Sequence, residues 1–135
     1  MKKIISTNDA PAAIGPYSQA VEVNSTLYIS GQLPINPTTG KIEVTTVDLQ
    51  SEQVFKNIAA ILQAAGYIFA DVVKSTVFLS DITNFAGMNE VYKKYYPSAC
   101  PARSAFAVKD LPMGALVEIE TIAASRKRRQ RDVWG

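Results

Sequence analysis

A helix followed closely by a strand, between Asp48 and Ser80, constrains the fold of this chain more than any other segment. Apolar residues recur at helical spacing from Asp48 to Ala65, and Gly66 is a typical helix stop. The next segment, Asp71–Ser80, is rich in β-branched residues and is predicted to be a strand. A strand–helix–strand crossover is normally parallel and right-handed, so it predicts a sheet with this helix packed on one face.

The segment before this helix is predicted to form a β-hairpin. Gln19–Val23 and Thr26–Ser30 are short β-favouring runs separated by the turn Asn24–Ser25, and Gly31 is expected to end the second strand. A loop with two prolines follows, because proline removes backbone donors from a sheet. Lys41–Val44 is predicted to be a short edge strand.

After the crossover, the pattern predicts a second helix and two more strands. Asp81 or Thr83 can cap this helix, which is expected to end before Pro97. Its apolar face is interpreted as core rather than as a platform for a ligand, and consists of Phe85, Met88, Tyr92 and Tyr95. Residues 103–109 and 115–125 are predicted to be the two strands.

These elements predict one domain over residues 1–125, in which two helices pack on one face of a mixed sheet in an α+β or α/β arrangement. No sequence remains to cover the other face of the sheet. An apolar sheet face must be buried against something, so we expect the chain to form an oligomer. A pocket where two subunits meet is a common result.

The net charge of +2 hides a division between the domain and the C-terminal end. Residues 1–125 carry nine Lys and Arg against eleven Asp and Glu, a net charge of −2. Residues 126–135 carry five Lys and Arg against one Asp, a net charge of +4. This basic tail is predicted to be disordered and solvated, and contact with nucleic acid through the tail is the alternative.

Two absences restrict the chemistry of the chain. It contains no histidine, and Cys100 is its single cysteine, which is interpreted as a small buried or surface thiol. This composition excludes a Ser-His-Asp triad, a Cys-His dyad and an intrachain disulfide, and no acidic cluster predicts a metal site. The chain begins unlike a signal peptide and has no run of about 18 apolar residues, so we expect a soluble cytoplasmic protein.

Arg103 is the only arginine in the first 125 residues, and it lies in an apolar segment. Its guanidinium can bind a carboxylate or phosphate through two parallel hydrogen bonds, which lysine cannot do. A later strand pattern, Val117–Ile122, carries Glu118 and Glu120 on one face. We expect pairing of the two strands to bring arginine and carboxylate together in an apolar wall, as an anion site; a structural ion pair is the alternative.

The chain resembles the RidA family, also called YjgF, over nearly everything from Lys3 to Ala124. The most specific residues are Pro101-Ala102-Arg103-Ser104, Phe106, Leu111 and Val117-Glu118-Ile119. Supporting segments are Ala10–Ala20, Ser30–Gln32, Ala65-Gly66, Val73–Phe78 and Asn89–Tyr92. The resemblance implies a chorismate-mutase-like α+β fold, a homotrimer whose three sheets form a central barrel, and ligand clefts between subunits.

The resemblance also implies an activity. RidA proteins are enamine/imine deaminases: they hydrolyse 2-imino acids, released by pyridoxal-phosphate enzymes that act on serine or threonine, to 2-keto acids and ammonia. For this chain the implied substrates are 2-iminobutanoate and 2-iminopropanoate. No cofactor and no metal are implied.

Several residues match family positions that have known roles. Arg103 matches the arginine that holds the substrate carboxylate, and Glu118 matches the carboxylate that positions or activates the attacking water. Tyr17 matches a tyrosine at the cleft, whose hydroxyl can contact the imine or the water; an aromatic residue that caps the loop by a contact within it is the alternative. Gly31, with Ser30 before it, matches the position at which the backbone approaches the ligand.

Three further positions are interpreted by the same resemblance. Asn89 matches a polar residue near the cleft, and a helix-surface amide is the alternative. Ala105 stands where many members carry cysteine, so only its backbone is expected to contact a ligand. Glu120, beside the matched Glu118, is interpreted as a structural partner.

The sequence leaves two other functions open. One is a regulatory module that binds small carboxylates without turnover, for which Arg103 alone would suffice. The other is an RNA-cleaving translation inhibitor, which the acidic domain and the absence of histidine disfavour. Glu118 favours the deaminase, because hydrolysis needs a group that handles water.

Overall fold

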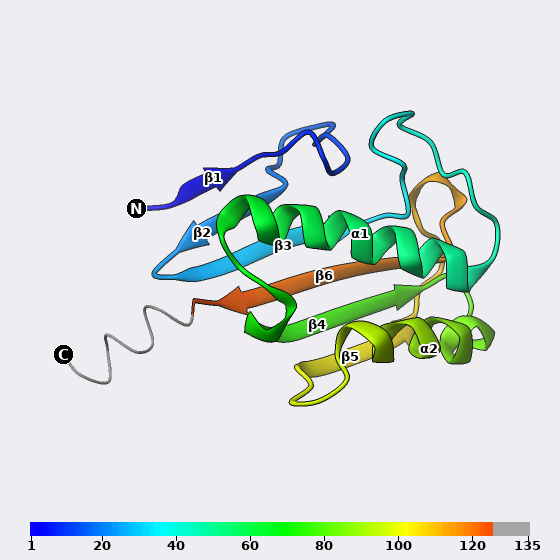
Figure 1. Cartoon of the computed structure of the whole chain (residues 1–135). Helices are drawn as coiled ribbons and strands as arrows, with labels where there is room; N and C mark the ends of the chain where they lie inside the picture. Colours follow the sequence, from blue (N-terminus) through cyan, green and yellow to red (C-terminus); the bar gives the residue numbers. More distant parts are fainter. Residues whose placement is uncertain (126–135) are drawn as a thin grey trace.

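A six-stranded mixed sheet with two α-helices on one face forms the fold (Figure 1). The computed structural model describes residues 1–125, so the predictions for the basic tail lie outside the described residues. The strands are β1 (Lys3–Ile5), β2 (Ala20–Val23), β3 (Thr26–Gln32), β4 (Val72–Leu79), β5 (Ala102–Ala107) and β6 (Val117–Ala124). The helices are α1 (Val47–Ala65) and α2 (Phe85–Tyr95).

The order of the strands places the C-terminal strand in the middle of the sheet. The order is β1-β2-β3-β6-β4-β5, and only β4 and β5 pair in parallel. Both β3 and β4 are antiparallel to β6, so they run parallel to each other on its two sides. The predicted parallel crossover through α1 is therefore confirmed, with β6 inserted between its two strands.

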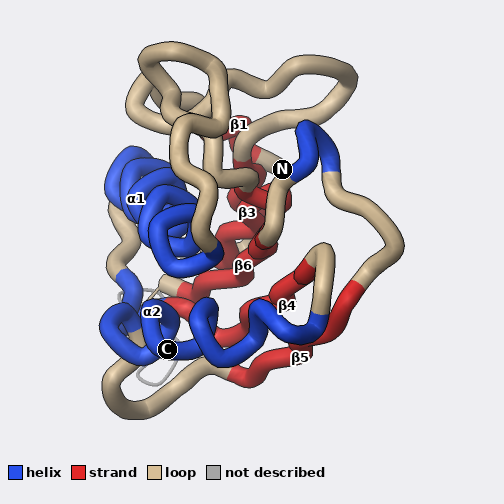
Figure 2. The backbone as a smooth tube through the Cα atoms, turned by 90° about the vertical axis from the view of Figure 1, so that its right-hand side faces the viewer, coloured by secondary structure: helices blue, strands red, loops and turns tan. Residues whose placement is uncertain are grey.

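Both helices cover the same face of the sheet (Figures 1 and 2). Helix α1 begins after Thr46 and ends at Gly66, whose φ of 82° lets its N–H bond back to the last turn. The apolar stripe of α1 is fully buried against the sheet, as the helical spacing predicted. The buried residues of this layer include Val54, Phe55, Ile58, Ile61, Leu62, Leu27, Val77, Leu79, Val117 and Ile119.

The aromatic face of α2 packs around one ring of α1. Phe55 stacks on Tyr95 with centroids 4.4 Å apart and meets Tyr92 edge-on at 5.8 Å. Met88 is also fully buried, so the interpretation of this face as core is confirmed. Two of its rings, those of Phe85 and Tyr92, have a second contact that the sequence did not predict: both lie against Arg103.

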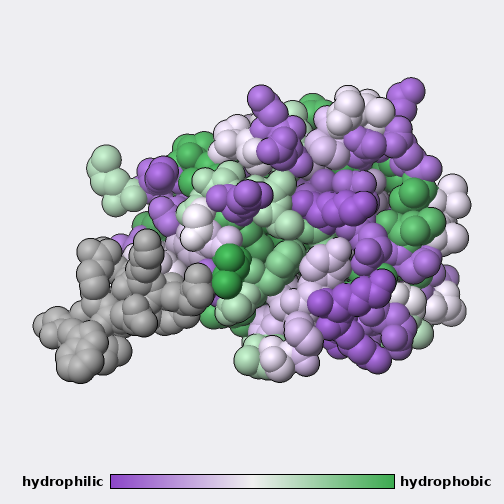
Figure 3. Space-filling model, in the orientation of Figure 1, coloured by the Kyte–Doolittle hydropathy of each residue, from purple (hydrophilic) through white to green (hydrophobic). Residues whose placement is uncertain are grey.

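The opposite face of the sheet has no cover within the described chain. On β6, Val117 and Ile119 are buried beneath the helices, whereas Glu118 and Glu120 point to the open face. Large side chains remain exposed among these strands, including Tyr28 (45%) and Phe106 (44%). By contrast, Figure 3 shows hydrophilic residues gathered over the helices on the covered side. The one-sided sheet that the element count predicted is thus present.

Some element boundaries differ from the prediction. Strand β3 ends at Gln32, one residue beyond the predicted end at Gly31, because it forms a bulge after Ile29 and pairs once more at Gln32. Lys41–Val44 is not an edge strand: only Lys41 bridges to Asn36, across the turn at Gly40.

Two further elements were missed or shifted. Strand β1 was not predicted, because three residues are too few to show a period. Asp81 does cap a helical turn, but that turn is the short 3-10 segment Ile82–Asn84 that leads into α2. Neither α-helix of residues 1–125 has the length and apolar character that crossing a bilayer requires.

Candidate functional site

A pocket of about 620 Å³ opens where the N-terminal loop, the end of β3 and strand β6 meet. Its polar lining includes four residues that the sequence analysis singled out: Tyr17, Ser30, Gly31 and Glu118. The structure therefore brings these four together, although they come from three separate segments. Glu120 lines the same pocket beside Glu118.

Glu118 is the carboxylate best placed to act as a base. Its side chain lies directly over Gly31, where an added Cβ would overlap with the carboxylate. Burial raises the pKa of Glu118 above its ordinary value of 4.5, and the negative charge of Glu120 raises it further. A carboxylate with a raised pKa is a stronger proton acceptor near neutral pH than an ordinary glutamate.

The loop that carries Tyr17 is fastened to the sheet by a glutamine that the sequence analysis did not single out. Gln19 is buried; its Oε1 accepts from the Thr7 N–H at 2.7 Å and its Nε2 donates to the Pro11 carbonyl at 2.8 Å. The Ser30 hydroxyl donates to the Ser18 carbonyl at 2.6 Å, so Ser30 anchors the same loop. Within the chain, its hydroxyl is therefore engaged with the loop.

Tyr17 itself stays accessible. Its side chain is 53% exposed, and its hydroxyl accepts a 3.4 Å hydrogen bond from the Ile14 N–H. This contact is part of the loop's own geometry, which was the alternative to a ligand contact. The hydroxyl hydrogen remains available to donate, because the Ile14 bond uses only a lone pair.

The pocket also has an apolar wall that was not predicted from the sequence. It includes Ile14, Ile35 and Met113, and Met113 has a left-handed backbone with φ of 59°. A non-glycine residue in this conformation gives no periodic sequence signal. The pocket thus has a polar floor at Gly31 and Glu118 and apolar side chains in its lining.

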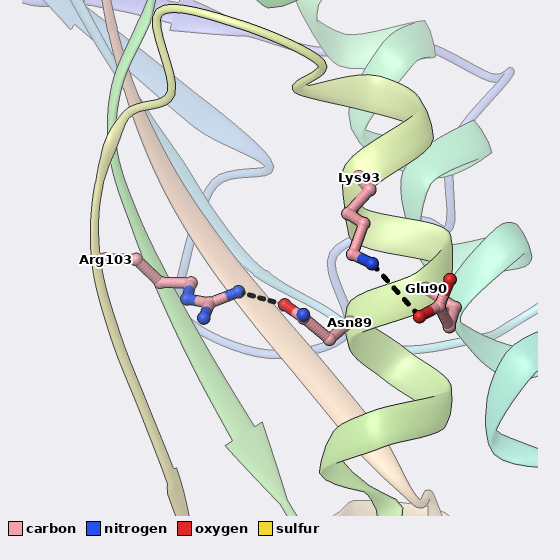
Figure 4. A network of polar contacts seen from close by, with 4 residues as sticks. All are labelled: Asn89, Glu90, Lys93 and Arg103. Carbon is pink, nitrogen blue, oxygen red and sulfur yellow. Dashed lines mark hydrogen bonds and ion pairs between the residues drawn. The ribbon is translucent and has the colours of Figure 1, made fainter.

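Arg103 lies at a different place, on β5, where its guanidinium reaches toward α2 (Figure 4). Its Nη1 donates to the Oδ1 of Asn89 at 2.7 Å, and the rings of Tyr92 and Phe85 lie 4.7 Å and 5.3 Å from its Cζ. No carboxylate of residues 1–125 forms an ion pair with it. Glu90, the nearest acidic neighbour of Asn89 in sequence, pairs with Lys93 instead (Figure 4).

The expected pairing of the Arg103 and Glu118 strands is wrong, because β4 lies between β5 and β6. The two side chains also leave opposite faces of the sheet. Arg103 is in register with Ser75, which is buried beneath the helices, whereas Glu118 is in register with Phe78 on the open face. A structural ion pair between the two is excluded by the same geometry.

The remaining predicted positions lie near Arg103. Asn89 contacts Arg103 through its side-chain oxygen, so it is more than a helix-surface amide. Ala105 lies on β5 opposite Val77 and packs against the core. The outer edge of β5 pairs with no other strand of the described chain, so backbone groups there are open to a ligand or another chain.

Within residues 1–125, no three acidic or cysteine side chains gather as metal ligands. Cys100 is exposed, and its thiol lies 3.4 Å from the Tyr96 carbonyl.

Comparisons of the sequence and of the structure with known proteins point to the same family. The chain is 54% identical over 123 residues to a Bos taurus protein named 2-iminobutanoate/2-iminopropanoate deaminase, covering 91% of this chain and 90% of that protein. The structure of YyfA from Yersinia pestis, described as a member of the conserved Rid protein family, is 48% identical, with a TM-score of 0.90 and coverage of 93% and 100%. The structure of E. coli TdcF with bound serine is 43% identical, with a TM-score of 0.86 and coverage of 91% and 98%. The family model described as Endoribonuclease L-PSP matches residues 7–125, and the chain belongs to this family, the RidA (YjgF) family.

Proposed function

We propose that this protein hydrolyses small 2-imino acids, such as 2-iminobutanoate and 2-iminopropanoate, to 2-keto acids and ammonia in the cytoplasm. The observation that carries the proposal is the placement of Glu118, a half-buried carboxylate with a raised pKa, in one pocket with Tyr17 and the Gly31 backbone. The names of relatives such as the Bos taurus protein supply the substrate class.

We further propose that the complete site forms between two chains of a homotrimer. One chain cannot supply both groups to a four-carbon ligand, because Arg103 and Glu118 leave opposite faces of the sheet with β4 between their strands. Two strand spacings alone separate the backbones by about 10 Å. The uncovered sheet face and the unpaired edge of β5 are the surfaces on which a second chain would pack.

In this site Arg103 binds the substrate carboxylate, since its guanidinium has no anionic partner among residues 1–125 of its own chain. Glu118 accepts a proton from water as the water oxygen bonds to C2 of the protonated imine. The electron pair of the C=N bond moves to nitrogen and gives a carbinolamine. Glu118 returns the proton to that nitrogen, and the C–N bond breaks with its electron pair on the departing ammonia. The hydroxyl proton passes through Glu118 to the ammonia, so that the keto acid and ammonium leave.

A coupled assay tests the activity. A serine or threonine dehydratase supplies the imine, and keto-acid release is followed with and without this protein. We expect acceleration by the wild type and almost none by Glu118→Gln. A wild type that leaves the rate unchanged would show that the protein is not an imine deaminase.

Mixing two inactive variants tests the shared site. Homotrimers of Arg103→Ala and of Glu118→Gln should each be inactive. When equal amounts are refolded together and assemble at random, about a quarter of the sites combine Arg103 from a Glu118→Gln chain with Glu118 from an Arg103→Ala chain. These sites should regain activity. An absence of recovery would place the whole site in one chain.

Binding without turnover is a second candidate, favoured by the E. coli TdcF structure with bound serine. The variant Glu118→Gln separates the two functions, because a binder should be indifferent to the loss of a base. RNA cleavage is a third candidate, favoured by the description Endoribonuclease L-PSP. The net charge of −2 over residues 1–125 opposes phosphate binding by the domain, and removal of residues 126–135 tests the tail.

A further inference from the structure

The guanidinium of Arg103 is held from several sides before any ligand binds. The amide of Asn89 accepts a hydrogen bond from one end at 2.7 Å, and the rings of Tyr92 and Phe85 lie within cation–π distance. All three residues project from α2, which is anchored to α1 through its buried side chains. The arginine on the edge strand is therefore fixed by a helix rather than by its own strand.

This arrangement leaves the charge of Arg103 available. The guanidinium has five N–H donors, and Asn89 is a neutral partner that occupies one of them. The nearby Glu90 is held by Lys93 on another side of α2 (Figure 4). Aromatic rings displace water from a cation without cancelling its charge, so they strengthen its attraction for an incoming carboxylate.

We infer that Phe85 and Tyr92 are positioning residues for substrate recognition: they clamp Arg103 in the orientation that receives the carboxylate. An unclamped arginine would lose rotamer freedom on binding, and pre-ordering removes that cost from the binding step. The ring of Tyr92 is buried and touches Phe55 and Tyr96, so it serves as the rigid side of the clamp. Phe85 is partly buried and forms the outer side.

A pair of matched substitutions separates the clamp from general packing. Phe85 and Phe69 are both partly buried against the same core, but only Phe85 lies over Arg103. Phe69 instead contacts Phe55, Tyr95 and Tyr96. Both Phe85→Leu and Phe69→Leu should lower stability, because each loses a ring at the margin of the core.

The inference rests on the proposed function. The probe is 2-oxobutanoate, whose affinity is measured by calorimetry. The coupled assay gives kcat and KM. Phe85→Leu should weaken 2-oxobutanoate affinity and raise KM by about two- to fivefold, the factor that corresponds to one exposed cation–π contact. Its kcat should change little, because the carboxylate is bound equally before and during reaction. Phe69→Leu should keep wild-type affinity and KM.

Tyr92 supplies a second comparison. Tyr92→Phe keeps the ring and should retain wild-type affinity, whereas Tyr92→Leu should weaken affinity in the same sense as Phe85→Leu. If Phe85→Leu and Phe69→Leu bind 2-oxobutanoate equally well while the wild type is active, the clamp is refuted and the deaminase proposal stands. If the wild type neither binds 2-oxobutanoate nor accelerates hydrolysis, the proposed function fails and the clamp with it.

Discussion

Replacing Gly31 with alanine tests the site at its tightest point. An added Cβ would lie 3.0 Å from Cδ and 3.3 Å from Cγ of Glu118, and would overlap with Oε2. The backbone of Gly31 is not in the left-handed region, so alanine adds no φ strain. The atoms that must move belong to the end of a flexible side chain, so the carboxylate of Glu118 should shift while β3 stays in place.

The expected effect on activity follows from the size of that shift. Restoring an ordinary contact requires the carboxylate to move by about 1 Å, and a misplacement of this size costs about 100-fold in rate. Stability should change little or rise by up to about 1 kcal/mol, because alanine reduces the freedom of the unfolded chain. Gly31→Ala should therefore keep the fold and the oligomeric state of the wild type and be almost inactive in the coupled assay, with an unchanged or higher urea midpoint.

A double-mutant cycle shows whether the loss acts through Glu118. In the Glu118→Gln background, which lacks the proposed base, Gly31→Ala should cause little further loss of rate. A full additional 100-fold loss would mean that the methyl group blocks the ligand itself. Near-normal activity of the single variant Gly31→Ala would refute the assignment of Glu118 at its observed position as the base.

The remaining predictions concern the charged groups and one turn. Arg103→Lys should keep the fold but lose about 30- to 150-fold in kcat/KM, since a lysine cannot form the two parallel bonds worth about 2 to 3 kcal/mol; near-wild-type kinetics would contradict its role. The acid limb of the pH–rate profile should lie above the ordinary glutamate pKa, because the base form of Glu118 is lost as pH falls through its raised pKa. Glu120→Gln should move that limb to lower pH by removing a like charge, and an unmoved limb would show that Glu118 is not the titrating group. The wild type should lose stability as pH rises from 4 to 7, because the pKa of Glu118 is higher in the folded state than in the unfolded state. Glu118→Gln lacks this loss, so its stability relative to wild type should be greater at pH 7 than at pH 4; thermal melts of both proteins at both pH values measure this. Ser25→Gly should raise the free energy of unfolding by about 0.5 to 1 kcal/mol in urea titrations with unchanged activity, because Ser25 has a left-handed φ of 58° in the hairpin turn.

The elements with a clear period were predictable from the sequence. The stripe of α1, the β-branched run of β4 and the stop at Gly66 depend on local spacing, and each is found within a residue or two of the expected place. The bulge at Gly31 was not predictable in the same way, because it depends on the pairing of β3 with a strand far along the chain. The segment Lys41–Val44 has a composition that suits an edge strand, but only Lys41 finds a partner, Asn36, and one bridge does not make a strand.

In the candidate site, too, some positions were predictable from the sequence and others depended on the fold. Tyr17, Gly31 and Glu118 were identified through family resemblance, and the structure places them in one pocket. The error concerned Arg103, since sequence order says that two strands are consecutive but not that a third lies between them. Gln19 was missed because a buried glutamine is recognised by its hydrogen bonds, here four to Thr7, Ala10 and Pro11, which only the fold brings together.

In the proposed trimer, the separation of Arg103 and Glu118 onto opposite faces of the sheet would make catalysis depend on protein concentration. In the proposed trimer each chain carries two half-sites, and neither half completes a site without a neighbour. Dilution below the assembly constant would remove activity from chains that remain fully folded. A keto acid held between two chains would in turn favour their association, so ligand affinity and assembly would be coupled by mass action. The amount of protein in a cell would then set both the number of active sites and the fraction of chains that form them.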